Sequence, residues 1–176
     1  MSRLALFLFA LNLLPSLANA GDVKQMMIEK INSERDRKEL RPLAYNRKLE
    51  VAAQSHAGWM ARTGKMVHVQ GEKPRGNSRE VWAASTWHPI NRAIRASYLP
   101  LDVLSEPDAD AHIAENVAHG DPKSGPNRFR PSSIVSGWMK SAGHREAMLG
   151  AYRDVGIGVM ITEQGDVFWC AVFGKP

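Results

Sequence analysis

The chain contains very little cysteine, which limits how its fold can be stabilised. A single cysteine, Cys170, occurs in 176 residues. No internal disulfide can therefore form, and the fold depends on its hydrophobic core. Because Cys170 lies within an apolar run that is typical of a β-strand, the sequence predicts an inert, buried thiol.

Familiar catalytic and nucleic-acid-binding signatures are also missing. The chain has no Gly-x-Ser-x-Gly elbow, no His-Glu-x-x-His helix, no Cys-x-x-Cys pair and no phosphate-binding glycine loop. Lys and Arg exceed Asp and Glu by 23 to 18, but no basic run is interleaved with aromatic residues. We therefore expect no nucleic-acid partner. The modest positive charge favours acidic partners, such as anionic glycans or lipid headgroups.

After residue 20 the chain has no hydrophobic run long enough to cross a bilayer. Residues 1–20 have the three parts of a secretory signal peptide: Arg3, an apolar run over 4–14, and small residues at Ala18 and Ala20. We expect cleavage before Gly21, which removes Arg3 and lowers the formal charge from +5 to +4. The sequence thus predicts a secreted or periplasmic protein whose residues 21–176 form one domain without a transmembrane segment.

Apolar spacing predicts two helices in the first part of this domain. The first covers about 23–40, with Val23, Met27 and Ile31 four residues apart. The second begins near Asn46, a good N-cap residue, and ends near Gly64. Its apolar stripe is expected to pack against a sheet and contains Leu49, Ala52, Ala53, Ala57, Met60 and Ala61.

The second half of the chain alternates irregular and regular patterns. Residues 72–112 read as an irregular insertion with one short helix near 90–98, and they are either functional or an elaborated loop. A loop over 121–131 precedes a helix capped by Ser132 or Ser133, and a short helix follows over 144–149. The clearest strands, 155–162 and 167–173, predict an antiparallel hairpin. The second strand is apolar throughout, so both of its faces should be covered by helices.

Three dispersed residues could share a site. They are His68, after the second helix, Glu115, and His144. Two imidazoles and a carboxylate can bind a divalent metal or exchange protons if the fold brings them together. They can equally form a structural hydrogen-bond network.

An ordered series of motifs resembles the CAP superfamily, the pathogenesis-related-1 and sperm-coating-protein (SCP) group, in its bacterial branch. The series covers most of the chain: Asn32 and Arg35, the stripe from Leu43 to Ala61 with His56, then His68, Ala114-Glu115-Asn116-Val117, Trp138-x-x-Ser141-x-Gly143-His144-Arg145, Val155-Gly156-Ile157-Gly158-Val159, and Phe173-Gly174.

The resemblance implies an α+β fold, a three-layer α-β-α sandwich with a small mixed or antiparallel sheet and a cleft on one face. In that family two histidines and two glutamates line the cleft, and the histidines can hold a divalent cation, often zinc. Here His68, Glu115 and His144 match three of the four, and the fourth position is occupied by Ser141. The implied metal ligands are His68 and His144, with Glu115 as a third ligand or as an acceptor that orients an imidazole.

The leading interpretation is a non-enzymatic binding module with this cation cleft and a lipid, glycan or protein ligand. The alternative is an extracellular hydrolase in which the metal, or Glu115 with His144, activates water. Arg145 would either hold an anionic ligand in the cleft or bind helix-end carbonyls. Of the remaining residues, His56 and Trp138 are expected in the core, His88 and His112 in solvent, and His119 either near the cleft or turned away from it.

Overall fold

The computed structural model describes residues 20–75, 78–121, 123 and 130–176. The predicted signal peptide therefore lies outside the described residues, apart from Ala20, and so does most of the loop over 121–131. No helix in the described part of the chain is long and apolar enough to cross a membrane.

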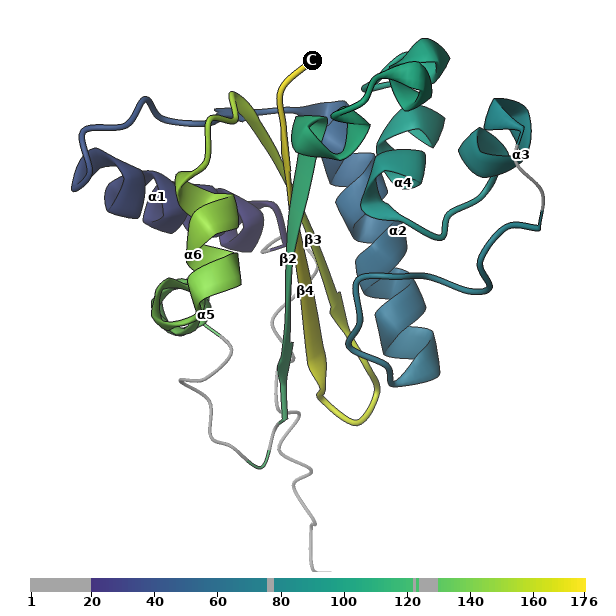
Figure 1. Ribbon diagram of the computed structural model, residues 1–176. Helices are drawn as coiled ribbons and strands as arrows, with labels where there is room; N and C mark the ends of the chain where they lie inside the picture. The colour runs from purple at the N-terminus through teal and green to yellow at the C-terminus, as the bar shows by residue number, and fades with distance from the viewer. Residues whose placement is uncertain (1–19, 76–77, 122, 124–129) are drawn as a thin grey trace, which may run out of the picture.

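The described chain forms helices on both sides of one four-stranded sheet (Figure 1). The helices are α1 (Ala20–Asp36), α2 (Arg47–Thr63), α3 (Arg79–Ala84), α4 (Pro89–Arg95), α5 (Pro131–Lys140) and α6 (Ala142–Leu149), with 3-10 turns η2 (Leu101–Ser105) and η3 (Ala109–His112). The strands are β1 (Ala44–Tyr45), β2 (Ile113–Gly120), β3 (Asp154–Ile161) and β4 (Val167–Gly174). This confirms the predicted α+β sandwich.

The strand order is β1-β3-β4-β2, with β1 parallel to β3 and the other two pairs antiparallel. The strand β4 is central, and its side chains alternate between two cores. Trp169, Ala171 and Phe173 pack with α1, α5 and α6, whereas Phe168, Cys170 and Val172 pack with α2 and α4. Both faces of the last strand are therefore covered, as its unbroken apolar sequence predicted.

Local signals placed α2 correctly. The Asn46 side chain accepts the Lys48 N–H, and Gly64 ends the helix in the left-handed conformation at φ 66°. Leu49, Ala53 and Met60 are fully buried, as the stripe required. The predicted hairpin and the buried thiol of Cys170 are confirmed as well.

Several boundaries differ from the sequence prediction. The first helix stops at Asp36 rather than near Leu40, because a turn with Glu39 at φ 57° follows it. The N-cap of α5 is Arg130, not Ser132 or Ser133, because Pro131 occupies the first helical turn. Residues 72–112 are more regular than predicted: their described part contains α3, η2 and η3 in addition to α4, which matches the short helix predicted near 90–98.

Candidate functional site

The strand β2 forms one edge of the described sheet and carries Glu115 toward the α2 and α4 side. Its carboxylate is surrounded by polar partners although its side chain is only 1% exposed. Oε1 lies 3.2 Å from His68 Nδ1 and 3.6 Å from His56 Nε2. Oε2 accepts a 2.5 Å hydrogen bond from Arg92 Nη2, and the Cys170 thiol donates a second hydrogen bond to it at 3.4 Å. Both oxygens of the carboxylate are therefore engaged.

The electrostatics of this cluster keep Glu115 ionised. Burial opposes ionisation, but the Arg92 charge and the hydrogen bond from His68 outweigh it and lower the pKa of Glu115 to about 2. The same burial, reinforced by the Glu115 charge, raises the pKa of Cys170 well above its ordinary value. Glu115 is thus a fixed hydrogen-bond acceptor at neutral pH, and Cys170 is a neutral thiol.

Arg92, in the middle of α4, is a site residue that the sequence prediction missed. Its guanidinium is buried and donates to four groups: the carbonyls of Thr86, Trp87 and His68, and the carboxylate of Glu115. These hydrogen bonds connect the insertion to Glu115 on β2 and fix the position of the His68 backbone. No local pattern could identify it, because its carboxylate partner lies 23 residues away in the sequence.

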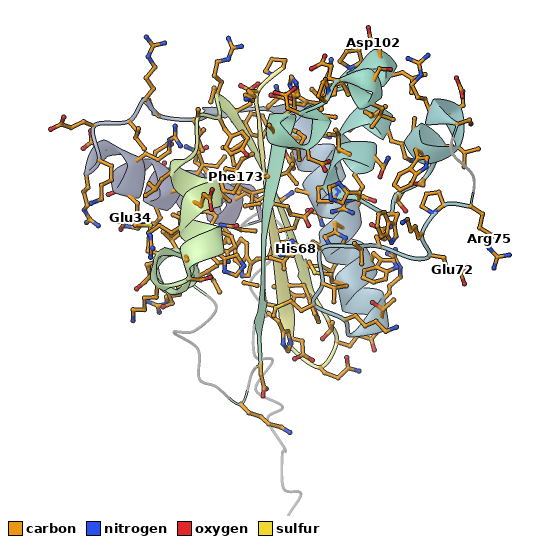
Figure 2. The ribbon with its side chains drawn as sticks, in the orientation of Figure 1. Glu34, His68, Glu72, Arg75, Asp102 and Phe173 are labelled. Atoms are coloured by element: carbon orange, nitrogen blue, oxygen red, sulfur yellow. The ribbon has the colours of Figure 1, made fainter. Side chains whose placement is uncertain are left out.

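The segment that follows α2 presents His68 to the cleft. It is held to the core by His56, which is fully buried: Nε2 donates to the Val67 carbonyl at 2.8 Å, and Nδ1 lies 3.3 Å from the side-chain amide of Gln70. Burial lowers the pKa of His56, so its imidazole is neutral. The packed, hydrogen-bonded role predicted for His56 is confirmed. In Figure 2, His68 lies between β2 and α4, and its side chain is half-exposed.

The second histidine of the site, His144, lies on α6, in the opposite helical layer. The centroid of its ring is 6.4 Å from that of His68 and also 6.4 Å from the buried ring of Trp138. Its carbonyl accepts a 2.9 Å hydrogen bond from Asn116 Nδ2 on β2. Burial, followed by the charge of His68, lowers the pKa of His144. The two layers meet across the β2 edge, and this brings the two histidines together.

A cleft of about 490 Å³ connects these residues. His68, Glu115, Ser141 and His144 all line it, so the fold unites four of the five predicted cleft residues. Arg145 does not line it: its side chain donates to the Met139 carbonyl at 3.0 Å, the helix-end role. The sequence prediction missed further lining residues, including Asn116, Glu146 and Tyr152. Of these three, only Asn116 could have been found from the sequence, because it belongs to the Ala114–Val117 motif.

The candidate metal ligands are near one another but are not equally available. In the described part of the chain, only Glu106, Asp108 and His112 bring three His, Cys, Asp or Glu ligand atoms within 4.8 Å of one another. His68, Glu115 and His144 do not form such a group, and the Glu115 carboxylate is occupied by Arg92. The donor set that remains is two imidazoles, which suits zinc with oxygen donors at its other positions.

The other histidines lie away from the cleft, and two of the sequence interpretations need correction. His112 is not solvated: its ring nitrogens contact the Lys175 carbonyl and Glu106. His88 is half-buried rather than free in solvent, and burial lowers its pKa. His119 turns away from the cleft, stacks on Phe168 and contacts Asp166 at 2.9 Å. Trp138 is buried and donates to the Val117 carbonyl, as a core residue should.

Comparison with solved structures supports this fold. The chain superposes on an extracellular SCP-domain protein from Bacillus anthracis with a TM-score of 0.64 at 18% identity, covering 89% of this chain and 41% of that one. For an outer surface protein from Borrelia burgdorferi the TM-score is 0.63 at 17% identity, with coverage of 89% and 94%. A cysteine-rich secretory protein from Staphylococcus aureus gives 0.53 at 17% identity, with coverage of 92% and 41%.

The chain thus spans less than half of the Bacillus and Staphylococcus proteins and nearly all of the Borrelia protein. No curated protein sequence matches it. Residues 28–173 match the sequence profile described as CAP, cysteine-rich secretory protein family. That match covers nearly every described element from α1 to β4, and it includes the cleft lined by His68, Glu115 and His144. This chain therefore belongs to the CAP family.

Proposed function

We propose that the protein is a secreted or periplasmic binding module whose cleft holds a divalent cation, most suitably zinc, between His68 and His144. The observation that carries the proposal is the pairing of His68 Nδ1 with the ionised Glu115 carboxylate at 3.2 Å. An imidazole whose Nδ1 is occupied by a carboxylate offers Nε2 as a ligand, and this carboxylate–histidine pairing is common behind metal-bound histidines.

The state of His144 agrees with a ligand role. Its pKa is lowered, so the ring is neutral at neutral pH and can donate a lone pair. The 6.4 Å separation of the two ring centroids is close to the roughly 5–6 Å expected of two imidazoles that share one zinc ion with Zn–N bonds of about 2.0 Å. Small rotations of the half-exposed His68 side chain can supply the difference.

Glu115 acts as a positioning residue in this proposal, not as a third ligand. Arg92 and His68 already use its two oxygens, and turning it toward a metal would leave the buried Arg92 charge without its partner. Ser141, Glu146 and Tyr152 line the rest of the cleft. The cation would supply positive charge for an oxygen donor of the ligand, such as a lipid headgroup, a glycan carboxylate or a protein side chain.

Binding is favoured over hydrolysis by the same electrostatics. A general base for water should have a pKa near the working pH. The pKa of Glu115 is about 2, and its oxygens are engaged by Arg92 and His68, so it is a poor base near neutrality. The position of the family's second glutamate is occupied by Ser141, which cannot replace a carboxylate in acid–base work.

Zinc titration calorimetry of the metal-free protein at pH 7.5 tests the proposal. His68→Ala and His144→Ala should each weaken binding by more than Glu115→Gln, for which about 10- to 100-fold is expected of a residue that orients a ligand. Affinity should fall at pH 5.5, because protons compete for the imidazoles. His119→Ala is a matched control on β2, and His112→Ala reports on the exposed Glu106–Asp108–His112 group. Affinity that depends on His112 and ignores His68 and His144 would refute the proposed site.

A further inference from the structure

A second cavity lies within the insertion, apart from the cleft. It has a volume of about 500 Å³ and shares no lining residue with the cation cleft. Its walls come from α3, α4, η2 and η3, and Figure 1 shows α3 as the element of this layer that lies farthest from the sheet. A volume of this size suits a small ligand or the end of a larger one.

Two tryptophans line this cavity. The ring centroids of Trp82 and Trp87 are 5.7 Å apart, with their planes at 79°. Both side chains are half-buried, and both line the cavity. Ile90 and Leu104 complete the apolar lining. An indole surface at the wall of an open cavity is the usual contact for a flat, partly apolar ligand face.

The two tryptophans are held in place before any ligand arrives. The buried Asn91 side chain donates to the Trp82 carbonyl at 2.9 Å, and Arg92 Nη1 donates to the Trp87 carbonyl at 3.2 Å. The Lys73 ammonium lies 5.9 Å from the Trp82 ring centroid and 5.7 Å from that of Trp87. A preformed wall lowers the entropy cost of binding.

Hydrogen-bond donors and acceptors both line the cavity beside the indoles. Arg79 is exposed and supplies N–H donors, with one directed at Ser105 Oγ at 2.7 Å. Asp110 supplies carboxylate acceptors and is 80% exposed, and His88 Nδ1 lies 3.6 Å from its Oδ1. The cavity that the two tryptophans line thus also offers donors from Arg79 and acceptors from Asp110.

Carbohydrate is the ligand class that uses all of these groups. Each sugar hydroxyl both donates and accepts, which matches Arg79 and Asp110, and the C–H face of a sugar ring can lie on an indole. An organic cation fits less well, because Lys73 already contacts both rings and Arg79 adds positive charge. A simple anion would use Arg79 but be repelled by Asp110.

We propose that this insertion cavity binds a carbohydrate, with a sugar ring packed on Trp82 and Trp87 and its hydroxyls bonded to Arg79 and Asp110. The ligand is either a soluble oligosaccharide or a segment of a surface polysaccharide, which have the same ring chemistry. This site shares no lining residue with the cation cleft and would give the insertion a role of its own.

The test measures binding of the full chain to a panel of neutral and acidic tetrasaccharides. Binding is detected by tryptophan fluorescence and by calorimetry. The panel contains β-1,4-linked glucose, β-1,4-linked N-acetylglucosamine, α-1,4-linked glucose and α-1,4-linked galacturonate, and choline chloride serves as the organic cation. Co-sedimentation with cellulose and chitin separates a polymer-binding site from one for soluble chains. Binding in either arm supports the proposal.

Trp82→Ala and Trp87→Ala should weaken sugar binding by about tenfold or more, as expected for central aromatic contacts. Arg79→Gln and Asp110→Asn change only exposed side chains and should weaken it without unfolding the protein. Asp102→Asn is the matched control, since this exposed aspartate of η2 does not line the cavity (Figure 2).

His68→Ala should leave sugar binding intact, which separates this result from the zinc experiment. Absence of binding to every carbohydrate, binding of choline instead, or sugar binding that survives both tryptophan changes would overturn the proposal.

Discussion

At the scale of single residues, the Glu115–Arg92 pair determines how the site is organised. Both side chains are about 1% exposed and are joined at 2.5 Å. A buried ion pair adds little net stability over apolar residues, yet removing one partner is costly because the other charge stays buried. The pair therefore serves mainly to fix positions: Glu115 orients His68, and Arg92 holds the His68 carbonyl.

This arrangement makes stability depend on pH in a defined direction. The pKa of Glu115 falls from about 4.5 in the unfolded chain to about 2 in the folded protein. The stabilisation is therefore complete above about pH 4.5 and is lost as pH falls through about 2. We expect Glu115→Gln to lower the free energy of unfolding at pH 7 by about 3 kcal/mol, because it leaves Arg92 without its charge partner.

The measurement is urea unfolding from pH 7 to pH 2.5 in buffer with EDTA, for wild type, Glu115→Gln and the control Glu72→Gln, whose side chain is exposed (Figure 2). The difference between wild type and Glu115→Gln should shrink as pH falls. A constant difference over the whole range would show that folding does not lower the pKa of Glu115.

At the scale of elements, the close contact between α2 and β3 depends on two glycines. A Cβ atom at Gly156 would lie 2.1 Å from the backbone of Leu49 and Glu50, and one at Gly158 would lie 2.3 Å from that of Ala53. The missing side chains let the α2 backbone rest directly on the sheet. The Val-Gly-Ile-Gly-Val pattern of β3 is thus a packing requirement, not a flexible segment.

Gly156→Ala should consequently destabilise the protein by about 1–3 kcal/mol or more, as expected for overpacking against immovable backbone. Gly137→Ala is the matched control, because a Cβ at this exposed position of α5 meets nothing within 4 Å. Alanine there should be neutral or stabilising by about 0.5–1 kcal/mol, since glycine is a poor helix former. Chemical denaturation midpoints of the two variants give the comparison. Equal midpoints would contradict the packing assigned to α2.

Elements defined by local signals could be predicted from the sequence, and those defined by distant partners could not. The cap of α2 and the β3–β4 turn depend on neighbouring residues. The edge strand β2 escaped prediction because its buried Glu115 and Asn116 look polar in isolation, and their partners come from α4, α6 and the segment after α2. β1 has only two residues and no pattern of its own.

At the scale of the whole molecule, the ordered series of motifs predicted more of the site than local patterns did. His68 lies in the segment after α2, Glu115 on β2 and His144 on α6, and spacing alone cannot show that they meet. Family resemblance placed them in one cleft, and the structure shows that they line it. It could not reveal Arg92 or the Trp82–Trp87 cavity, because both belong to the insertion, which carried no motif.

Export from the cytoplasm is the last prediction, and it rests on residues 1–20, whose pattern is typical of a secretory signal peptide. A signal peptidase reads small residues one and three positions before the cut, which here are Ala20 and Ala18. We expect the exported protein to begin at Gly21, with an intact mass that lacks residues 1–20. Ala20→Phe should block processing and retain the full-length mass, because a bulky ring does not fit the first of these positions. Asn19→Gln changes the position between them and should be processed normally. Exported protein that retains Met1, or an Ala20→Phe variant cut as efficiently as wild type, would contradict this assignment.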